Sequence, residues 1–416
     1  MRKKVIVRGP ALTRSGYGEH TRFLLRALRQ KEDKFDIYLI PTGWGQTGWI
    51  NEDDEERRWL DFVIHKTSAF QQQKGQFDVS LQVTIPNEWE PMAPINIGVT
   101  AGIETTKVAP VWLEKANMMD KIITISEFSK QGFTNTFYDG VDTRNNQPVR
   151  LVCNKEIDIV HYPVKKFDKT KLQLKFDTDF NFLTMAQWGP RKNIANTVKW
   201  FVEEFIDQEV GLVVKAFFKG NSLIDRTHMQ NNLTSLLQEY DNRKCKVYLL
   251  HGDLDDQEIH SLYKHPKIKA FISLAHGEGF GLPIYEAAYS GLPVLAVDWS
   301  GHVDYLYKPV KDKKGKLKRR AHFAKVDYDI APIPKEAVWD GVLTPDSMWS
   351  YAKQGSYKMK LREVHRDYGR YKKQAQGLKN WIHKEFAEDR QYKAMTDSIL
   401  AACEPQVEDL QVVSFE

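Results

Sequence analysis

Residues 268–306 read IKAFISLAHGEGFGLPIYEAAYSGLPVLAVDWSGHVDYL, and the rest of the chain is organised around this stretch. Two apolar runs of strand length, residues 268–275 and 293–299, lie on either side of a glycine-rich loop. A helix is expected between the runs, because Pro283 fits a first helical turn, where a missing N–H costs little. The stretch therefore predicts strand, loop, helix and strand, which is a unit of an α/β fold.

The loop and the helix start form a candidate anion-binding site. Gly277, Gly279 and Gly281 carry no Cβ atom, so the loop backbone can approach a ligand closely. The N–H groups between Leu282 and Tyr285, where Pro283 has none, are expected to point unpaired into a cleft, an arrangement that suits phosphate. Glu286 lies about one turn into the helix, so its carboxylate can face the same cleft.

A second glutamate in the loop completes a family pattern. Glu278 and Glu286 are separated by seven residues and are followed by Gly291-Leu-Pro-Val. This pattern resembles the signature of the retaining glycosyltransferases of group 1, or family 4. The resemblance implies an α/β fold of the GT-B type, in which two Rossmann-like domains face each other across a cleft and a C-terminal helix crosses back. The alternative is an ordinary strand–loop–helix turn with solvated glutamates, and the glycine spacing does not match the dinucleotide fingerprint.

Length and composition agree with a two-domain globular protein. The chain has 416 residues, of which 42% are hydrophobic and 12% aromatic. The apolar runs are shorter than the roughly 18 residues that a membrane span needs, and the N-terminus leads into a strand without a signal-peptide pattern. Three widely spaced cysteines favour a reducing compartment over a disulfide framework or a zinc site. We therefore expect a cytoplasmic protein with no transmembrane segment and no bound metal.

Two stretches open Rossmann-type units. A short strand at residues 5–7 and a helix over residues 19–30 enclose a glycine-containing loop, and a second such opening at residues 181–187 follows a polar linker at residues 164–171. With the resemblance, these openings predict an N-terminal acceptor domain over residues 1–165, a nucleotide-sugar domain over residues 166–385, and a helix that returns to the first domain over residues 386–416.

The resemblance also implies roles for individual residues of the donor site. Glu286 would hold the ribose of a nucleotide-sugar donor, and Glu278 would hold the transferred sugar. Backbone donors would come from Gly279, Phe280, Gly281 and Leu282. In the first domain, Gly16 and Gly18 correspond to glycines that close over the donor, although a tight turn needed only for packing would also explain them.

A basic loop at residues 188–193, WGPRKN, is expected to neutralise the donor diphosphate. Lys192 matches the lysine that the family places here. The usual arginine would lie near Gln187 and is missing, so Arg191 is the substitute, and both cation types are reasonable phosphate partners. The alternative, a solvated basic helix start, is disfavoured because cations near a helix N-terminus oppose the dipole.

The sequence is less informative about the donor base and the acceptor. His251 and Gly252 open a segment that resembles the family loop whose backbone holds the base, so no side chain reveals which base is bound. Glu104 lies where many family members have a histidine and some a glutamate. It either orients an acceptor hydroxyl or pairs with Lys107. Tyr17, between the two N-terminal glycines, is a second acceptor candidate.

Residues 308–325, KPVKDKKGKLKRRAHFAK, form a basic segment with nine Lys or Arg and one Asp. Its centre suits a hairpin turn. It is either a solubilising surface or a contact for the phosphate backbone of a nucleic acid. The candidate contacts are Lys313, Lys314, Lys316, Lys318, Arg319 and Arg320. Another polar segment, residues 139–150, is expected to be irregular.

Together these features indicate a glycosyltransferase that moves a hexosyl or pentosyl group from a nucleotide-diphosphate sugar to an acceptor hydroxyl. Same-face attack is favoured, with no cofactor beyond the donor, because neither a metal-ligand cluster nor an obvious covalent nucleophile is present in the sequence. The acceptor is a saccharide, a lipid-linked sugar or DNA with a hydroxylated base. The remaining alternatives are a GT-B epimerase or phosphorylase and a binding module without activity. The sequence does not indicate an oligomeric state.

Overall fold

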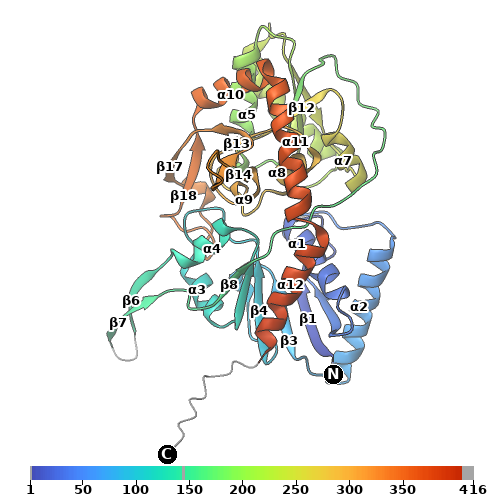
Figure 1. Cartoon of the computed structure of the whole chain (residues 1–416), viewed down its shortest axis with the longest axis vertical. Helices are drawn as coiled ribbons and strands as arrows, with labels where there is room; N and C mark the ends of the chain where they lie inside the picture. The colour runs from blue at the N-terminus through green and yellow to red at the C-terminus, as the bar shows by residue number, and fades with distance from the viewer. Residues whose placement is uncertain (1, 143–145, 405–416) are drawn as a thin grey trace, which may run out of the picture.

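The computed structural model describes residues 2–142 and 146–404 and contains two parallel sheets of six strands each (Figure 1). The first sheet has the order β2-β1-β3-β4-β5-β8. Its strands are Lys3–Gly9 (β1), Phe35–Pro41 (β2), Val79–Val83 (β3), Ile95–Thr100 (β4), Lys121–Thr124 (β5) and Ile157–Ile159 (β8). The second sheet has the order β11-β10-β9-β12-β13-β16. Its strands are Asn181–Gln187 (β9), Gly211–Phe217 (β10), Lys246–Leu250 (β11), Ile268–Ser273 (β12), Val294–Val297 (β13) and Ala324–Val326 (β16).

Helices pack against each sheet, and polar residues at their starts explain where several of them begin. The helices of the first domain are Gly16–Arg29 (α1), Glu55–Gln72 (α2), Pro110–Asn117 (α3) and Glu127–Thr134 (α4), with a 3-10 turn at Pro86–Glu88. The hydroxyl of Ser15 caps α1 by accepting a hydrogen bond from the Gly18 N–H at 2.9 Å, and Asp54 caps α2 in the same way. Such caps satisfy N–H groups that have no intrahelical acceptor.

Among the described residues, the second domain has more helices than the first. They are Ile194–Phe205 (α5), Leu223–Leu237 (α6), Asp256–Tyr263 (α7), Leu282–Ser290 (α8), Val303–Leu306 (α9), Gln354–Arg366 (α10) and Tyr368–Glu385 (α11). The 3-10 turns are Pro190–Lys192, Gln238–Tyr240 and Lys335–Ala337. Asp255 and Glu258 form a capping box at the start of α7. No helix among the described residues combines the length and the apolar composition that a membrane-spanning segment requires.

The strand order of the second sheet determines where a ligand can bind. From the central strand β9, the chain adds β10 and β11 on one side and then β12 and β13 on the other. The order therefore reverses between β9 and β12, and in open α/β sheets the crevice at such a point is the usual ligand site. The loops that follow β9 and β12 contain the basic and glycine-rich motifs identified in the sequence.

The last helix, Glu388–Cys403 (α12), leaves the second domain and lies against α1 of the first (Figure 1). Tyr392 stacks on Phe23, with ring centroids 5.9 Å apart, and the Ser398 hydroxyl donates to Asp158 at 2.6 Å. The predicted crossing helix is thereby confirmed, although part of the predicted range 386–416, residues 405–416, lies outside the described residues. The GT-B arrangement follows from the two parallel sheets and this returning helix.

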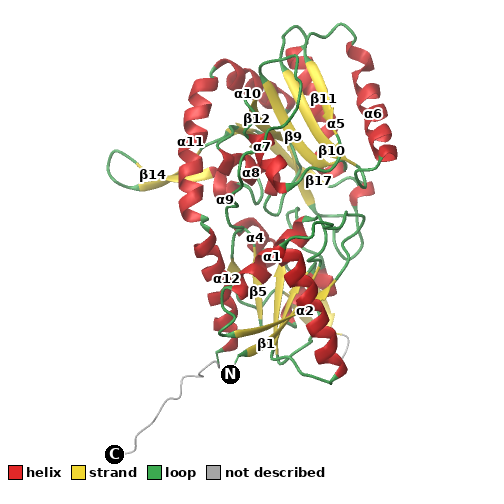
Figure 2. Ribbon diagram, turned by 90° about the vertical axis from the view of Figure 1, so that its right-hand side faces the viewer, coloured by secondary structure: helices red, strands yellow, loops and turns green. Residues whose placement is uncertain are grey.

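Two hairpins project from the domains. Residues 139–150 were expected to be irregular, but residues 139–142 and 147–150 belong to the antiparallel pair Tyr138–Asp142 (β6) and Gln147–Leu151 (β7), so the prediction is wrong for them. Residues 143–145 of the predicted range lie outside the described residues. Opposite charges at paired positions explain the error, because Asp139 faces Arg150 across the strands and forms an ion pair with it. The basic segment contains the predicted hairpin, Tyr307–Lys311 (β14) and Leu317–Ala321 (β15), which extends away from the body of the protein (Figure 2).

A third hairpin, Tyr328–Pro332 (β17) and Met348–Ala352 (β18), connects the second domain to the first. Between its strands, Val342 is buried in a cluster with Trp89 and Trp112 of the first domain. The carbonyl of Met348 also accepts a hydrogen bond from the N–H of Thr106 at 3.2 Å. This hairpin therefore contributes to the docking of the two domains.

Candidate active site

The loops after β9 and β12 bring two cations and a carboxylate together. Lys192 and Arg191 end the 3-10 turn that follows β9, and Glu278 lies in the glycine loop that follows β12. The Nζ atom of Lys192 is 2.5 Å from Oε1 of Glu278, and Nη1 of Arg191 is 3.2 Å from Oε2. Arg191 Nη1 also donates to the Gly277 carbonyl at 2.7 Å. The three residues predicted to be catalytic are therefore in direct contact.

The charge state of this cluster follows from burial and proximity. Burial disfavours the ionised form of Glu278, but the positive charges of Lys192 and Arg191 outweigh it and lower the pKa of the carboxyl group to about 2. Burial, together with the adjacent charge of Arg191, lowers the pKa of Lys192. Glu278 is thus ionised at neutral pH and neutralises cations that were predicted to face a diphosphate.

Glu104 reaches the same cluster from the first domain. Its Oε1 atom is 3.2 Å from Nη2 of Arg191. Lys107, the alternative partner expected from the sequence, forms its ion pair with Asp346 of the β17–β18 connection instead. The predicted Glu104–Lys107 pair is wrong because domain docking supplies each of these side chains with a partner from the other domain.

The glycine loop packs directly on the first domain. A Cβ atom at Gly277 would lie 2.0 Å from the carbonyl oxygen of Glu104, and one at Gly279 would lie 2.3 Å from that of Ala101. The Gly279 carbonyl also accepts a hydrogen bond from the Ser126 hydroxyl at 2.6 Å. These glycines therefore allow the loop to contact the backbone of the first domain.

Backbone donors at the start of α8 remain free. Gly281, with a φ of 81°, precedes the helix in a conformation that favours glycine, and its carbonyl accepts from the Tyr305 hydroxyl at 3.0 Å. Within the described residues, the N–H groups of residues 279–282 make no hydrogen bond to the protein. Tyr285 donates its N–H to the Gly281 carbonyl at 3.0 Å, so the prediction that this group is unpaired is wrong. It lies far enough into α8 to reach an acceptor four residues back.

The side chain of Phe280 is buried in an aromatic cluster that joins the domains. Its ring centroid lies 5.2 Å from that of Tyr162 and 5.0 Å from that of Tyr285. Tyr285 donates its hydroxyl to the Tyr162 carbonyl at 3.0 Å. Phe280 can therefore reach a ligand through its backbone, as predicted for this loop, while its ring stabilises the domain contact.

Glu286 lies one turn into α8, away from the charged cluster. Its Oε2 accepts a hydrogen bond from the Tyr263 hydroxyl at 2.9 Å. Burial raises the pKa of Glu286 to about 7, against the smaller opposing effects of the Tyr263 hydrogen bond and the Lys165 charge. The two glutamates of the motif thus differ in protonation, because Glu278 has two adjacent cations while Glu286 has a neutral hydrogen-bond donor.

A cavity of about 360 Å³ lies between the domains. The first domain lines it with Arg14, Thr47, Gly48, Trp49 and Asn51. The second domain contributes the ends of β9 and β10, residues 252–254, and Pro283 of α8. The predicted Gly252 is among the lining residues.

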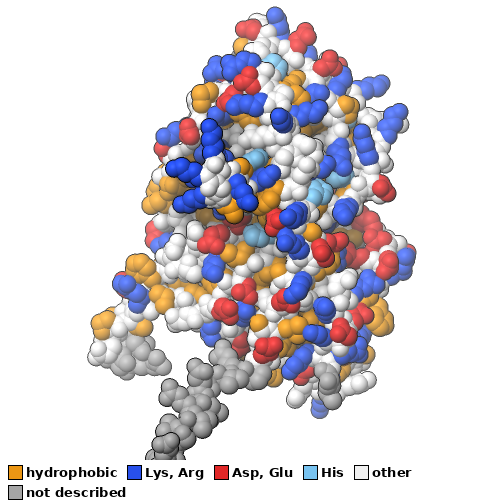
Figure 3. All heavy atoms as spheres, viewed as in Figure 1, with side chains coloured by type: hydrophobic (Ala, Val, Ile, Leu, Met, Phe, Trp, Pro, Cys, Tyr) orange, Lys and Arg blue, Asp and Glu red, His pale blue; other side chains and the backbone are white. Residues whose placement is uncertain are grey.

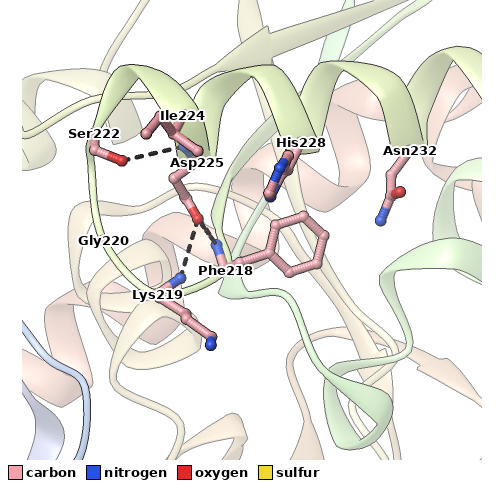
Figure 4. A pocket seen from close by; sticks show the side chains of 8 residues that line it. All are labelled: Phe218, Lys219, Gly220, Ser222, Ile224, Asp225, His228 and Asn232. Atoms are coloured by element: carbon pink, nitrogen blue, oxygen red, sulfur yellow. Dashed lines mark hydrogen bonds between the residues drawn. The ribbon is translucent and has the colours of Figure 1, made fainter.

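The predicted His251 is not among the lining residues of this cavity and contacts Asp225 instead. Its Nε2 lies 2.9 Å from Oδ2 of Asp225, and Asp225 accepts hydrogen bonds from the N–H groups of Phe218 and Lys219 (Figure 4). Asp225 thereby connects the segments that follow β10 and β11, and it lines a wider surface hollow of about 650 Å³ along α6. Among residues 2–142 and 146–404, no group of three or more His, Cys, Asp or Glu could hold a metal ion.

The N-terminal glycines and Tyr17 are placed differently from one another. A Cβ atom at Gly18 would lie 2.2 Å from the Thr13 carbonyl, so packing alone requires this glycine. Gly16 is exposed and has open space around it. The Tyr17 side chain is buried, and its hydroxyl lies 2.8 Å from Oγ1 of Thr100. Of these three, Gly16 has the freedom to meet a ligand.

Lys215, which lies outside the motifs recognised in the sequence, also lines the cavity. The side chain is buried within β10, and its Nζ donates to the Gly252 carbonyl at 2.6 Å. Its signal in the sequence is a single charge inside the apolar run GLVVKAFF at residues 211–218.

Comparisons with known proteins agree with the fold. Residues 166–313 match the family described as glycosyl transferases group 1. No curated protein matches the sequence. The structure of Anabaena HepE in complex with UDP and glucose is similar at 12% identity, with a TM-score of 0.59 over 96% of this chain and 100% of that chain. Sucrose-phosphate synthase from Thermosynechococcus elongatus is similar at 12% identity, with a TM-score of 0.63 over 97% and 100%.

The catalytic domain of starch synthase IV from Arabidopsis thaliana, bound to ADP and acarbose, is similar at 11% identity, with a TM-score of 0.55 over 96% of this chain and 99% of that domain. At such identities the likeness concerns the fold. The GT-B fold predicted from the sequence is confirmed by these neighbours and by the two parallel sheets.

Proposed function

Because residues 166–313 match the family of group 1 glycosyltransferases and the chain has the GT-B fold, we propose that this protein is a retaining glycosyltransferase. It transfers a hexosyl or pentosyl group from a nucleotide-diphosphate sugar to an acceptor hydroxyl. The contact of Glu278 with Lys192 and Arg191 carries this proposal. The two cations lie at the same edge of the second sheet as the free N–H groups of residues 279–282. A diphosphate bound there would be stabilised by both.

The ligands named for two structural neighbours support the donor class. HepE is described in complex with UDP and glucose, and the Arabidopsis domain is described bound to ADP. Both ligands contain a nucleoside diphosphate, the part of the donor that the second domain would hold. The cavity of about 360 Å³ beside Pro283 has room for a nucleoside, since ligand pockets of this kind begin near 300 Å³.

In the proposed reaction, the bond between the anomeric carbon of the sugar and the diphosphate oxygen breaks, and the acceptor oxygen bonds to the same face of that carbon. The leaving phosphate oxygen takes the acceptor proton. Negative charge grows on the diphosphate, so Lys192 and Arg191 stabilise the transition state. In the structure Glu278 forms ion pairs with both cations. The diphosphate replaces Glu278 there, which frees the carboxylate for the sugar hydroxyls, and the reaction uses no bound metal or cofactor.

The other residues of the motif bind the rest of the donor. Glu286 accepts hydrogen bonds from the ribose hydroxyls, next to its contact with Tyr263. Gly16 closes over the donor from the first domain, where it has open space. Glu104 orients the acceptor hydroxyl, because it is the carboxylate of the first domain that reaches the cluster. A saccharide or a lipid-linked sugar is the acceptor in this proposal.

A panel of nucleotide sugars tests the function. One donor should be hydrolysed slowly, and faster release of nucleoside diphosphate is expected when a suitable acceptor hydroxyl is added. The anomeric configuration of the product, measured by NMR coupling constants, should equal that of the donor. An inverted product would contradict the retaining mechanism, and binding without turnover for every donor would favour the binding module.

A GT-B epimerase and a phosphorylase are distinguished by their products in the same assay. Epimerisation would convert the donor sugar without any transfer to an acceptor. Phosphorolysis would require inorganic phosphate and would release a sugar phosphate. Either product in place of a glycoside would overturn the proposed transferase.

DNA with a hydroxylated base is a second candidate acceptor, favoured by the β14–β15 hairpin. Lys and Arg side chains gather over this hairpin on the protein surface (Figure 3). In the described part of the chain, Lys313, Lys314, Lys316 and Arg320 are exposed and form no ion pair, although the charge of Arg320 acts on the nearby Asp312. Such free cations suit a phosphate backbone. Lys318, which pairs with Asp312 at 3.4 Å, is partly neutralised.

Arg319 is different from the other candidate contacts. Its Nη2 donates to the carbonyls of Val303 and Asp304, at 3.2 and 2.9 Å, which ties the hairpin to α9. Substitution of Arg319 would therefore disturb the hairpin itself, so Arg319 stays unchanged in the variant that tests DNA binding.

Salt dependence tests the DNA candidate. The variant in which Lys313, Lys314, Lys316, Lys318 and Arg320 are all changed to Gln should bind duplex DNA more weakly, with a log–log salt slope lower by up to about 4. Donor hydrolysis should stay unchanged, and a Lys372→Gln, Lys373→Gln control on α11 should keep the original slope. No duplex binding by the unmodified protein at ~50 mM salt would exclude this acceptor and leave the saccharide and lipid-linked candidates.

A further inference from the structure

Lys215 occupies an unusual position in the second sheet. It lies near the carboxyl end of β10, level with Met185 of β9 and Leu250 of β11. Because side chains alternate along a strand, Lys215 and Phe217 share one face of the sheet, and both line the cavity between the domains. The side chain of Lys215 is therefore buried on one face of the sheet and lines the site proposed for the nucleoside.

The Lys215 ammonium is buried with fewer partners than it can use. The residue is 6% exposed, and its Nζ donates to the carbonyl of Gly252 at 2.6 Å. An ammonium group has three donors, and within residues 2–142 and 146–404 no carboxylate forms an ion pair with it. Burial lowers the pKa of Lys215, against a smaller opposing effect of Asp253. A buried lysine without a paired carboxylate is costly, which indicates a purpose other than stability.

The surroundings of Lys215 suit a flat heterocycle. Phe217, Leu254 and Ile259 give the cavity apolar walls, and Gly252 continues the wall with a φ of 118° that favours glycine. The hydrogen bond from Lys215 to Gly252 fixes the ammonium at the edge of this space. Polar side chains, among them Arg14, Gln187 and Asp253, line other parts of the cavity. Apolar walls combined with a few placed polar groups are the usual composition of a small-molecule site.

We propose that Lys215 selects the base of the donor nucleotide, by donating a hydrogen bond to a ring carbonyl oxygen of uracil or guanine. This inference rests on the proposed function. Adenine has an exocyclic amino group where guanine has a carbonyl, so its donor faces the Lys215 donor and the ammonium gains no acceptor beyond the Gly252 carbonyl. Unused donors on a buried ammonium cost enough to favour a carbonyl-bearing base by about 10-fold or more.

Lys215 is assigned to the base rather than to the diphosphate because of its position. The cations predicted to face the diphosphate, Lys192 and Arg191, lie on the loop after β9, next to Glu278. Lys215 instead contacts Gly252, in the segment predicted to hold the base. Its side chain thus supplies base specificity that backbone recognition alone would not provide.

The experiment measures dissociation constants of UDP, GDP and ADP for the full chain by isothermal titration calorimetry. The unmodified protein should bind UDP or GDP at least about 10-fold more tightly than ADP. Lys215→Met, which keeps the length and the apolar part of the side chain, should bring the three constants to within about 3-fold of one another, mainly by weakening the preferred ligand. Lys219→Met removes an exposed lysine of the same segment and should leave the preference unchanged. Melting temperatures verify that both variants fold.

The results distinguish a failure of the proposed function from a failure of the Lys215 assignment. If none of the three nucleoside diphosphates binds the unmodified protein, the proposed function fails. If they bind but ADP is preferred, or if Lys215→Met retains the preference of the unmodified protein, the assignment of Lys215 is overturned while the transferase proposal stands. An equal loss for all three ligands in Lys215→Met would also overturn the assignment and would attribute Lys215 to diphosphate binding.

Discussion

Arg191 of the second domain forms an ion pair with Glu104 of the first domain, with Nη2 and Oε1 3.2 Å apart. The other terminal nitrogen of the same guanidinium contacts Glu278 at 3.2 Å. Two carboxylates from opposite domains therefore share the cation that was predicted to face the diphosphate. A donor that binds Arg191 has to compete with both of them, so donor binding and domain contact are linked at this residue.

Removal of the Glu104 charge should strengthen nucleoside diphosphate binding. Glu104→Gln eliminates one competitor for Arg191, and a partly exposed ion pair of this kind contributes about 0.5–1 kcal/mol, which corresponds to roughly 2–5-fold in affinity. Calorimetric titration with the preferred nucleoside diphosphate measures the change. If Glu104 also orients the acceptor, sugar transfer should fall while donor hydrolysis is retained. Weaker binding by Glu104→Gln would mean that Arg191 depends on Glu104 for its orientation.

Loss of the Lys192 charge should mainly slow the chemical step. Lys192→Ala removes a fixed cation at the leaving diphosphate, and the barrier should rise by about 2–4 kcal/mol, the scale of one electrostatic donor. The measurement is kcat for donor hydrolysis and for transfer. Lys199→Ala, on α5 and outside the charged cluster, is the matched control and should keep the original rate. An unchanged kcat in Lys192→Ala would remove Lys192 from the site.

Glu286 should make the stability of the protein depend on pH. Its pKa is raised from the ordinary 4.5 to about 7 by burial. Between pH 4.5 and about 7 the folded protein keeps a proton on Glu286 that the unfolded chain releases. The free energy of unfolding therefore falls as the pH rises through this range. Glu286→Gln cannot ionise and can still accept from Tyr263, so it should be more stable than the unmodified protein by about 1–3 kcal/mol at pH 8.

The gain from Glu286→Gln should vanish at pH 4.5, where the native carboxyl group is protonated. Thermal melts of both proteins at a series of pH values measure the difference. The same variant should bind the donor about 10-fold more weakly at pH 8, because it loses a charged acceptor for the ribose hydroxyls. A gain in stability that does not vary with pH would contradict the raised pKa.

Gly279 should tolerate no side chain, for a reason that involves the opposite domain. The Cβ atom of Gly279→Ala would lie 2.3 Å from the carbonyl oxygen of Ala101, so the contact between the domains has to shift. We expect a lower melting temperature and at least about 10-fold lower kcat, since small displacements of catalytic groups are costly. Gly355→Ala on α10, whose Cβ would meet no atom within 4 Å, is the control and should keep the original kcat.

The local part of the fold could be predicted from the sequence because it depends on nearby residues. The apolar runs around the glycine loop became β12 and β13, and Pro283 lies in the first turn of α8 as expected. Where the local signal was ambiguous, the prediction failed. Residues 139–150 contain no apolar alternation, and their pairing as β6 and β7 involves the cross-strand contact of Asp139 with Arg150.

The sequence by itself determined the motif, the order of the elements and the candidates Glu278, Lys192 and Arg191, because turn geometry, side-chain periodicity and spacing are properties of short segments. Only the tertiary structure decided which groups meet. It brought Glu104 to Arg191 and the Gly252 carbonyl to Lys215. These contacts join residues that are distant in the chain, and they form because parallel strands end at one edge of a sheet and because the two domains dock. Neither cause leaves a pattern in any single stretch of sequence.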